Sequence, residues 1–449
     1  MLFNEDVAFA PPVDHVVEKK IVRVPSFAQG AYTRLGARVR GEVSGVKRFH
    51  WGSYWHTRDG YGQSAVIMAE ELHKRGYEME LRDTGNEYQT LDCAESRLIQ
   101  KLRKKRVSDP DFEFAFCMAP DMGMLDLTSP FLVFYSMWEA TELPKTWIPF
   151  IREADTIITP SEWVASVFHA AVKNLSIPVV VVNVPLRSEV YKFREKAFLK
   201  RMYRTLSKRR PKPFRFLFVS TPVKRKGIDV LIEAFQQAFP VEALDNVALH
   251  LHMRTGPLNR HVFPEQDKVA ARVEDDYRIT YNLKPIPLRK LLKVYDKHDC
   301  LVHTSRSEGF GLTPCQAMAC GLPVICTNAT GCTEYVMSPE PYAFPINISG
   351  WESCDHAFYK EGEWSTPDVG HAAHQMRYVY EHREEAMDRA NKGSRWVLKN
   401  FGREATVAKL ERALEWSKAV HNLKMRSLKN SAGEDNSHQV PSQVVRVTL

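Results

Sequence analysis

The stretch SRSEGFGLTPCQAMACGLPVICT, from Ser305 to Thr327, decides which fold the sequence predicts. The apolar run from Asp299 to Ser305 leads into it and is typical of a buried parallel strand. Glu308 follows this strand, and Gly309 and Gly311 beside it allow the backbone to approach a ligand closely. The pattern therefore places a carboxylate at the carboxyl end of a strand, where open α/β sheets bind their ligands.

The residues after these glycines predict a short helix and a second strand. Thr313 is a natural N-cap, Pro314 suits the first helical position, and Gln316 completes a capping box. Gly321 ends the helix, and the next strand runs from Pro323 to Thr327. Because a helix N-terminus favours negative charge, the strand, the glycine turn and the helix together predict an anion-binding site.

These residues resemble a known signature. Glu308, the GFG run from Gly309 to Gly311 and the AMACGLPVI run are similar to the donor site of the family 4 (group 1) retaining glycosyltransferases. The resemblance implies an α/β fold of the GT-B type, in which two Rossmann-like domains face each other across a cleft and a C-terminal helix crosses back to the first domain. It also implies that Glu308 is the catalytic residue, which hydrogen-bonds the donor sugar.

The sequence departs from the family signature at one position. The signature has a second glutamate where Gln316 stands here. That glutamate contacts the nucleotide ribose through two acceptor oxygens, whereas a glutamine offers one acceptor and one donor group. Ribose binding is therefore expected to persist but to weaken, and a purely structural capping role for Gln316 carries equal weight.

A second turn, TPVKRKG from Thr221 to Gly227, carries three cations just before a predicted helix. Cations beside a helix dipole form a credible diphosphate site, although this turn alone is equally typical of a solvated basic loop. In the family a lysine and a glycine here contact the donor phosphates, and Lys226 and Gly227 match them. The usual arginine, about five residues earlier, is replaced by Thr221, and Arg225 is the candidate substitute. The predicted donor-binding residues are Lys226, Arg225, Gly309, Phe310, Gly311, Leu312, Thr313 and Gln316.

A glycine-rich turn early in the chain is a further candidate. It lies between a probable strand, Val46 to Trp55, and a helix with one apolar face. A plain strand-to-helix connection explains such a turn equally well. The resemblance favours a functional loop that faces the donor across the cleft, made of Gly60, Tyr61 and Gly62.

Two further side chains have structural interpretations that we favour over functional ones. Glu139 lies in the WEATELP segment, at the carboxyl end of a predicted strand, and could reach the cleft. A salt bridge within its own loop is slightly favoured. His303 lies within an apolar strand, where a hydrogen-bonded core histidine is expected more often than a ligand.

The composition allows two or three globular domains in 449 residues, with 44% hydrophobic and 11% aromatic residues. A net charge of +8 suits anionic partners such as sugar nucleotides, acidic lipid surfaces or nucleic acid, but selects none of them. Eight cysteines show no CxxC pair and no zinc-ligand spacing, so neither a metal site nor a disulfide framework is predicted. The first residues do not resemble a signal peptide, and no apolar run reaches the roughly 18 residues of a membrane helix. The sequence thus predicts a cytoplasmic protein, with peripheral membrane contact left open.

The order of the patterns predicts six regions along the chain. They are an irregular N-terminal arm (1–44), an acceptor-side Rossmann-like domain (45–190), a basic connector (191–213), a donor-side Rossmann-like domain (214–400), a crossing helix (401–428) and a disordered tail (429–449).

The function implied is metal-independent transfer of a sugar from a nucleotide-diphosphate sugar to an acceptor hydroxyl, with retention of configuration and without a cofactor. Fixed cations and a helix N-terminus would stabilise the leaving diphosphate. The acceptor is expected to be a glycan, a lipid-linked saccharide or a small molecule. One alternative is a nucleic-acid acceptor held by the basic runs Lys101–Arg106 and Ser207–Lys212. The other is a non-catalytic nucleotide-sugar-binding protein, which Thr221 and Gln316 favour; the donor sugar, the base and the oligomeric state stay open.

Overall fold

The computed structural model describes residues 47–55, 60–84, 97–129, 131–175, 177–206, 212–253, 273, 276–284, 286, 288–354, 356, 359–431 and 446–447. All of them belong to one compact unit, Glu42–Leu449. The predicted N-terminal arm lies outside the described residues. Within these residues, none of the helices combines the length and the apolar character that crossing a membrane requires.

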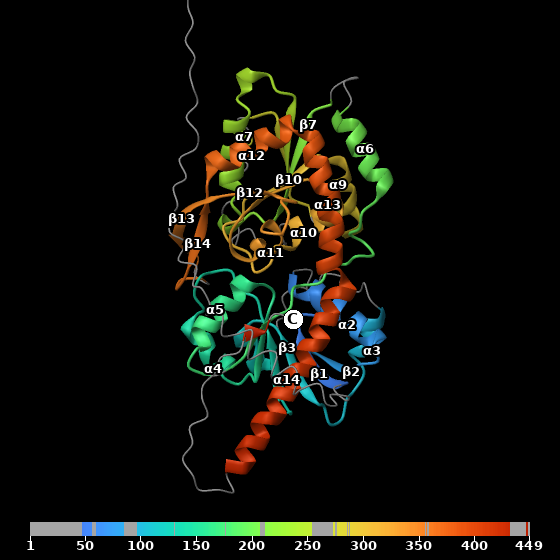
Figure 1. Cartoon of the computed structure of the whole chain (residues 1–449), viewed down its shortest axis with the longest axis vertical. Helices are drawn as coiled ribbons and strands as arrows, with labels where there is room; N and C mark the ends of the chain where they lie inside the picture. Colours follow the sequence, from blue (N-terminus) through green and yellow to red (C-terminus); the bar gives the residue numbers. More distant parts are fainter. Residues whose placement is uncertain are drawn as a thin grey trace, which may run out of the picture. The chain divides into compact units, whose positions relative to one another are not determined.

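The first sheet lies in the predicted acceptor-side domain, and its strands run parallel (Figure 1). The strands are β1 (Arg48–Ser53), β2 (Glu78–Asp83), β3 (Phe112–Phe116), β4 (Leu132–Tyr135), β5 (Thr156–Thr159), β6 (Val179–Val181) and β15 (Arg446–Val447). Their order is β15-β6-β5-β4-β3-β1-β2. Strands β3, β4 and β5 are buried at every position, as expected for strands covered on both faces.

The helices of this domain follow its strands in sequence. They are α2 (Gly60–Lys74), α3 (Arg97–Leu102), α4 (Ile148–Ile151) and α5 (Glu162–Val172), with short 3-10 turns η1 (Ala119–Met124) and η2 (Lys145–Trp147). Ser161 caps α5, because its Oγ accepts a hydrogen bond from the Val164 N–H at 3.2 Å.

The second sheet lies in the predicted donor-side domain and is also parallel. Its strands are β7 (Phe214–Ser220), β8 (Val247–Met253), β9 (Ile279–Asn282), β10 (Cys300–His303), β11 (Val324–Thr327) and β12 (Phe344–Ile346). The helical segments are η3 (Lys224–Lys226), α7 (Ile228–Ala238), η4 (Val241–Ala243), α9 (Leu288–Lys297), α10 (Leu312–Ala319), η5 (Thr330–Cys332), α11 (Thr333–Val336), α12 (Val369–Glu381) and α13 (Arg383–Phe401). An antiparallel hairpin, β13 (Ile348–Ser353) and β14 (Glu363–Pro367), interrupts this alternation.

The strand order identifies where a ligand should bind. The second sheet runs β12-β11-β10-β7-β8-β9, so the chain reverses direction across the sheet between β7 and β10. Ligands of doubly wound sheets bind at the carboxyl ends of the strands, at such a reversal. The turn after β7 carries the three cations, and the turn after β10 carries Glu308. The two predicted donor-site turns are therefore neighbours.

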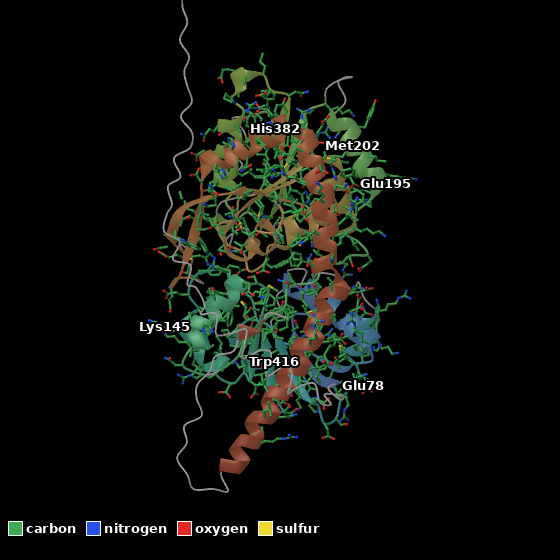
Figure 2. All side chains as sticks on the ribbon, viewed as in Figure 1. Glu78, Lys145, Glu195, Met202, His382 and Trp416 are labelled. Carbon is green, nitrogen blue, oxygen red and sulfur yellow. The ribbon has the colours of Figure 1, made fainter. Side chains whose placement is uncertain are left out.

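The predicted connector contains a helix, α6 (Glu195–Leu206), on which Figure 2 labels Glu195 and Met202. Arg201 on this helix is fully buried, and its guanidinium donates to the backbone carbonyls of His298, Tyr295 and Gly321. The helix is thereby fixed to the donor-side domain. The sequence predicted only a basic connector here, because it does not show that one arginine satisfies three backbone carbonyl groups.

The last helix, α14 (Arg403–Ser431; red in Figure 1), returns to the first domain as predicted. Arg403 pairs with Glu70 at 2.7 Å, and Arg75 pairs with Glu411. Farther along, Lys418 Nζ donates to the Asp111 carbonyl at 2.7 Å. These contacts join the C-terminal segment to the C-terminal end of the first domain's helix α2 and to the loop before β3.

The structure differs from the predicted disordered tail at several residues. Helix α14 continues to Ser431, and Arg446 and Val447 form strand β15 beside β6. Strand β6 would otherwise end the sheet with unpaired backbone groups, which an added strand satisfies. Three valines in QVVRV favour this strand, a signal that the polar composition of the tail conceals.

Candidate functional site

Glu308 is the centre of the candidate site. Its side chain is only 9% exposed, and its Oε1 lies 2.5 Å from Lys226 Nζ and 3.0 Å from His303 Nε2. Arg225 Nη1 lies 3.6 Å from the other carboxylate oxygen. Burial alone would raise the pKa of Glu308, but Lys226, His303 and Arg225 hold it well below its usual range. The carboxylate is therefore ionised at neutral pH.

The two cations lie on the turn after β7. Burial lowers the pKa of Lys226, and the neighbouring Arg225 lowers it further. For Arg225, burial opposes the charge, but the Glu139 carboxylate and other acidic neighbours raise its pKa above the ordinary value. Arg225 thus brings to Glu308 the guanidinium that the chain lacks at Thr221.

His303 is a site residue that the sequence analysis assigned to the core. Burial would lower its pKa, but hydrogen bonds with Cys332 and Glu308 raise it above its ordinary value. The ring is buried, as predicted, yet it contacts the Glu308 carboxylate. Its position as the last residue of β10, at the ligand-binding end of the sheet, was the available signal.

The two turns are locked together at Gly227. This residue adopts φ of 66°, and a Cβ there would lie 2.0 Å from the Thr304 carbonyl oxygen. Thr304 Oγ1 donates to the Gly227 carbonyl at 2.7 Å, and the Arg306 N–H donates to the Arg225 carbonyl at 2.7 Å. Only glycine combines this backbone conformation with this close approach, which explains why the turn has a glycine after its cations.

A third loop, after β11, fixes the backbone of Glu308. The Glu308 N–H donates to Thr330 Oγ1 at 3.0 Å, and the Glu308 carbonyl accepts from the Gly331 N–H at 2.8 Å. Thr330 has φ of 54°, a left-handed conformation that costs a β-branched residue free energy. A Cβ on Gly331 would lie 2.1 Å from the Gly309 carbonyl oxygen. The loop therefore maintains a strained conformation that packs directly against the Glu308 turn.

The capping box predicted for α10 is wrong. The helix begins at Leu312, its N-cap is Gly311 with φ of 81°, and no side chain caps it. Because glycine takes this left-handed conformation readily, the helix starts before Thr313 reaches a capping position. The buried Gln316 instead accepts a hydrogen bond from the Tyr295 hydroxyl at 3.5 Å.

Phe310 lies in the site sequence, but its side chain belongs to the core. It is 2% exposed and packs edge-on against Phe401 and Tyr335. Any contact between Phe310 and a ligand has to come from its backbone, as with Gly309 and Gly311. The donor-binding role predicted for Phe310 therefore stays a prediction for its backbone.

The predicted cleft loop lies beside the start of α10. A Cβ on Gly60 would lie 3.7 Å from the Leu312 side chain. The Tyr61 hydroxyl is already hydrogen-bonded within the first domain: it donates to the Met137 carbonyl at 3.1 Å and accepts from the Met137 N–H at 2.9 Å. Gly62 is buried within α2. Gly60 thus lies close to the second domain, and Tyr61 fixes the segment that precedes Glu139.

Direct hydrogen bonds connect the first domain to the donor-side loops. Ser161 Oγ donates to the Gly309 carbonyl at 2.8 Å. Glu334 accepts from the Glu162 N–H at 2.7 Å and from Asn183 Nδ2 at 2.9 Å. The N-terminal end of α5 is thus fixed to the loops that surround Glu308.

Glu139 makes a longer-range contact than the loop salt bridge predicted for it. Its Oε1 lies 3.6 Å from Arg225 Nη2, and its Oε2 accepts from the Tyr359 hydroxyl at 2.8 Å. Arg225 therefore lies between two carboxylates, one from each domain. Across the described part of the chain, no cluster of three or more His, Cys, Asp or Glu residues is placed to hold a metal ion.

Comparison with known proteins shows what this part of the chain resembles. Residues 213–345 match the family model described as glycosyl transferases group 1. The O-antigen chain mannosyltransferase B of Escherichia coli is 34% identical over 135 residues, 29% of this chain and 33% of that protein. The alpha-1,3/1,6-mannosyltransferase ALG2 of Mus musculus is 25% identical over 260 residues, 54% of this chain and 58% of that protein. The chain thus spans between a third and three fifths of the length of these curated relatives.

Solved structures show the same fold. Sucrose-phosphate synthase from Thermosynechococcus elongatus superposes with a TM-score of 0.60 at 15% identity, covering 83% of this chain and all (100%) of that one. Anabaena Alr3699/HepE in complex with UDP and glucose gives a TM-score of 0.57 at 14% identity, with 82% and 99% covered. The predicted GT-B fold, with its two Rossmann-like domains, is confirmed.

Proposed function

We propose that this chain, whose residues 213–345 match the family model of the group 1 glycosyl transferases, transfers a sugar from a nucleotide-diphosphate donor to an acceptor hydroxyl. One observation carries the proposal. Glu308, an ionised and nearly buried carboxylate, lies against Lys226 and Arg225 at the reversal point of a doubly wound sheet. Such a carboxylate can accept hydrogen bonds from sugar hydroxyls, while the adjacent cations suit a diphosphate.

Stabilisation of the leaving group explains why the cations are there. As the bond from the sugar to the diphosphate breaks, negative charge grows on the diphosphate oxygens. Lys226, Arg225 and the backbone N–H groups at the start of α10 are fixed donors that meet this charge without reorganisation. We propose that these groups supply the positive charge that stabilises the leaving diphosphate, without a metal ion. Leu312 and Thr313 contribute through their backbone N–H groups.

We propose that the sugar is transferred with retention of configuration, and the state of Glu308 supports this. Its carboxylate already accepts hydrogen bonds from Lys226 and His303, and its pKa is well below the usual range. It is therefore a weak proton acceptor at neutral pH. We propose that Glu308 orients the donor sugar and that the departing phosphate accepts the proton of the acceptor hydroxyl on the same face.

Thermal unfolding in the presence of nucleoside diphosphates and nucleotide sugars tests this proposal. A ligand that binds only the folded state raises the melting temperature, and it does so more strongly as its affinity increases. We expect nucleoside diphosphates of one base to raise the melting temperature, and one nucleotide sugar of that base to raise it further. A subsequent acceptor screen should then show transfer of that sugar. Stabilisation without transfer would favour a nucleotide-sugar-binding protein, and no stabilisation by any compound would contradict the donor site.

One observation favours an anionic acceptor as a second candidate. A cavity of about 630 Å³ beside β2 is lined by Arg82, Arg103, Lys104, Arg106, Gln100, Leu81 and Glu80. Four cations and one carboxylate suit a phosphate-rich acceptor such as a nucleic acid. The second basic run proposed for this role, Ser207–Lys212, lies mostly outside the described residues. Affinity that falls steeply with added salt, and falls again in Lys104→Ala, would support this acceptor; salt-independent binding would contradict it.

A further inference from the structure

Arg225 is shared between two carboxylates. Its Nη2 lies 3.6 Å from Glu139 Oε1, and its Nη1 lies 3.6 Å from Glu308 Oε2. Nη1 also donates to the Ser307 carbonyl at 2.5 Å. The proposed phosphate-binding guanidinium therefore already has anionic partners on both sides, and Glu139 is the one supplied by the other domain.

Glu139 is held in this position by the segment that includes hairpin β13–β14. The Tyr359 hydroxyl donates to Glu139 Oε2 at 2.8 Å, and Trp364 Nε1 donates to the Glu139 carbonyl at 2.8 Å. The Tyr359 ring also lies 5.9 Å from the Arg225 guanidinium carbon. Both the side chain and the backbone of Glu139 are thus fixed, so its carboxylate has a defined position beside Arg225.

The hairpin itself is firmly anchored. Trp364 is 1% exposed and belongs, with Tyr359, to the apolar cluster of the first domain that contains Trp138 and Trp147. Two hydrogen bonds join Thr141 and Glu363: the Thr141 N–H donates to the Glu363 carbonyl at 3.2 Å, and the Glu363 N–H donates to Thr141 Oγ1 at 2.8 Å. Burial of two aromatic side chains at this junction stabilises the position of Glu139 opposite Arg225.

The formal charges of the two cations and the two carboxylates around Arg225 balance. Lys226 and Arg225 contribute two positive charges, and Glu308 and Glu139 contribute two negative charges. A diphosphate that approaches Arg225 must replace Glu139 as its partner or share the guanidinium with it, and two anions within a few ångströms repel each other. The carboxylate of Glu139 therefore opposes binding of the diphosphate while keeping Arg225 oriented.

We propose that Glu139 sets the affinity of the diphosphate site: its carboxylate occupies Arg225 in the empty site, weakens diphosphate binding and speeds release of the nucleoside diphosphate product. This inference rests on the proposed donor site. It assigns to a first-domain residue control over a ligand that is held mainly by the second domain.

Glu139→Gln tests the inference with little structural change. The amide keeps the shape of the side chain and can still accept the Tyr359 hydrogen bond, but it removes one negative charge. Binding of inorganic pyrophosphate, measured by calorimetry, should become about tenfold tighter than in the wild type. Glu142→Gln is the matched control, because Glu142 lies in the same segment, is exposed and forms no ion pair among the described residues. Equal or weaker pyrophosphate binding by Glu139→Gln would overturn the inference.

A double-mutant cycle tests whether Glu139 acts through Arg225. In the Arg225→Gln background, Glu139→Gln should change pyrophosphate affinity by less than about twofold, since the shared partner is gone. A persistent tenfold gain would overturn the competition for Arg225. In the active enzyme, the inference predicts that Glu139→Gln lowers KM for the donor and lowers kcat by slowing product release. A higher KM would instead show that Glu139 helps to bind the donor.

Nucleoside diphosphates separate this inference from the proposed function. If wild type and Glu139→Gln bind a nucleoside diphosphate equally, the inference fails while the donor site stands. If pyrophosphate shows the tenfold gain but no nucleoside diphosphate binds either protein, the charge relationship holds and the glycosyltransferase proposal fails. If pyrophosphate binds neither protein, both are overturned.

Discussion

The Lys226 ammonium lies 2.5 Å from the Glu308 carboxylate, although 82 residues separate them in the sequence. The contact exists because β7 and β10 are adjacent, and the turn that follows each strand ends at the same edge of the sheet. Each residue neutralises a charge that would be costly to bury alone. The pair is thus a link between the fold and the proposed chemistry.

Glu308→Gln should reduce sugar transfer by at least about a hundredfold, because it removes the charge proposed to orient the donor. It should also lower the free energy of unfolding by about 2–4 kcal/mol, because Lys226 and Arg225 lose a buried counter-charge. Transfer rates and thermal melts of the same preparation check both effects. Normal transfer by a correctly folded variant would contradict the assignment of Glu308.

Gly227→Ala should destabilise the protein by more than about 3 kcal/mol, since the new Cβ meets a backbone oxygen and the φ angle is positive. Gly350→Ala is the control, because a Cβ there has no neighbour within 4 Å and its φ lies outside the left-handed range. We expect the control to change the melting temperature little. Similar melting temperatures for the two variants would refute the close approach of the two turns.

Ser161→Ala and Thr313→Ala distinguish a real cap from a predicted one. Ser161 caps α5 and also donates to Gly309, so its loss should cost about 1–2 kcal/mol. Thr313 makes no capping bond, and its replacement should cost less than about 0.5 kcal/mol. Thermal denaturation of both variants measures the difference, and the reverse ranking would restore the capping box at α10.

The pH dependence of stability should differ between wild type and His303→Gln. The hydrogen bonds from His303 to Cys332 and Glu308 raise its pKa in the folded state, although burial opposes the shift. The stability that this histidine contributes is therefore fully present below the unfolded pKa, near 6.5, and is lost as the pH rises through the folded pKa. Melting temperatures should differ more at pH 5.5 than at pH 8.5, and a pH-independent difference would contradict protonation of His303.

The contribution of Glu308 to stability should depend on pH in the opposite direction from that of His303, because it is lost in acid. Its folded-state pKa is held down, so its contribution is present above the unfolded pKa, near 4.5, and is lost as the pH falls through the lower folded value. Below pH 4.5 the melting temperatures of wild type and Glu308→Gln should converge. Curves that stay parallel down to pH 3 would show that the carboxylate is not specifically stabilised.

Patterns local to one strand and turn were read correctly from the sequence. The apolar run before Glu308, the glycines after it and the cations before Gly227 each gave the right element and the right end of the sheet. These predictions succeed because a buried strand requires a run of apolar residues and a positive φ favours glycine, so both can be recognised in the local sequence. The predicted capping box was wrong because the local sequence allows two N-caps, Gly311 and Thr313, and the helix uses Gly311.

Contacts between distant segments could not be predicted. Glu139 was assigned a structural role because nothing beside it in the sequence reveals Arg225 as its partner. The contacts of Arg201 were not predicted for the same reason, since its partners also come from distant segments. His303 differs, because Glu308 lies only five residues later and the place of the histidine at the end of β10 was a usable signal.

The aromatic anchor of the β13–β14 hairpin has a consequence for protein engineering. Trp364 is encoded in the second half of the chain but fills the hydrophobic core of the first domain. A chimaera that combines this first domain with the donor domain of a relative, joined near residue 190, would lack the indole and retain a hole of its size. Exchange of donor specificity by domain grafting therefore requires that residues 348–367 be kept with the first domain.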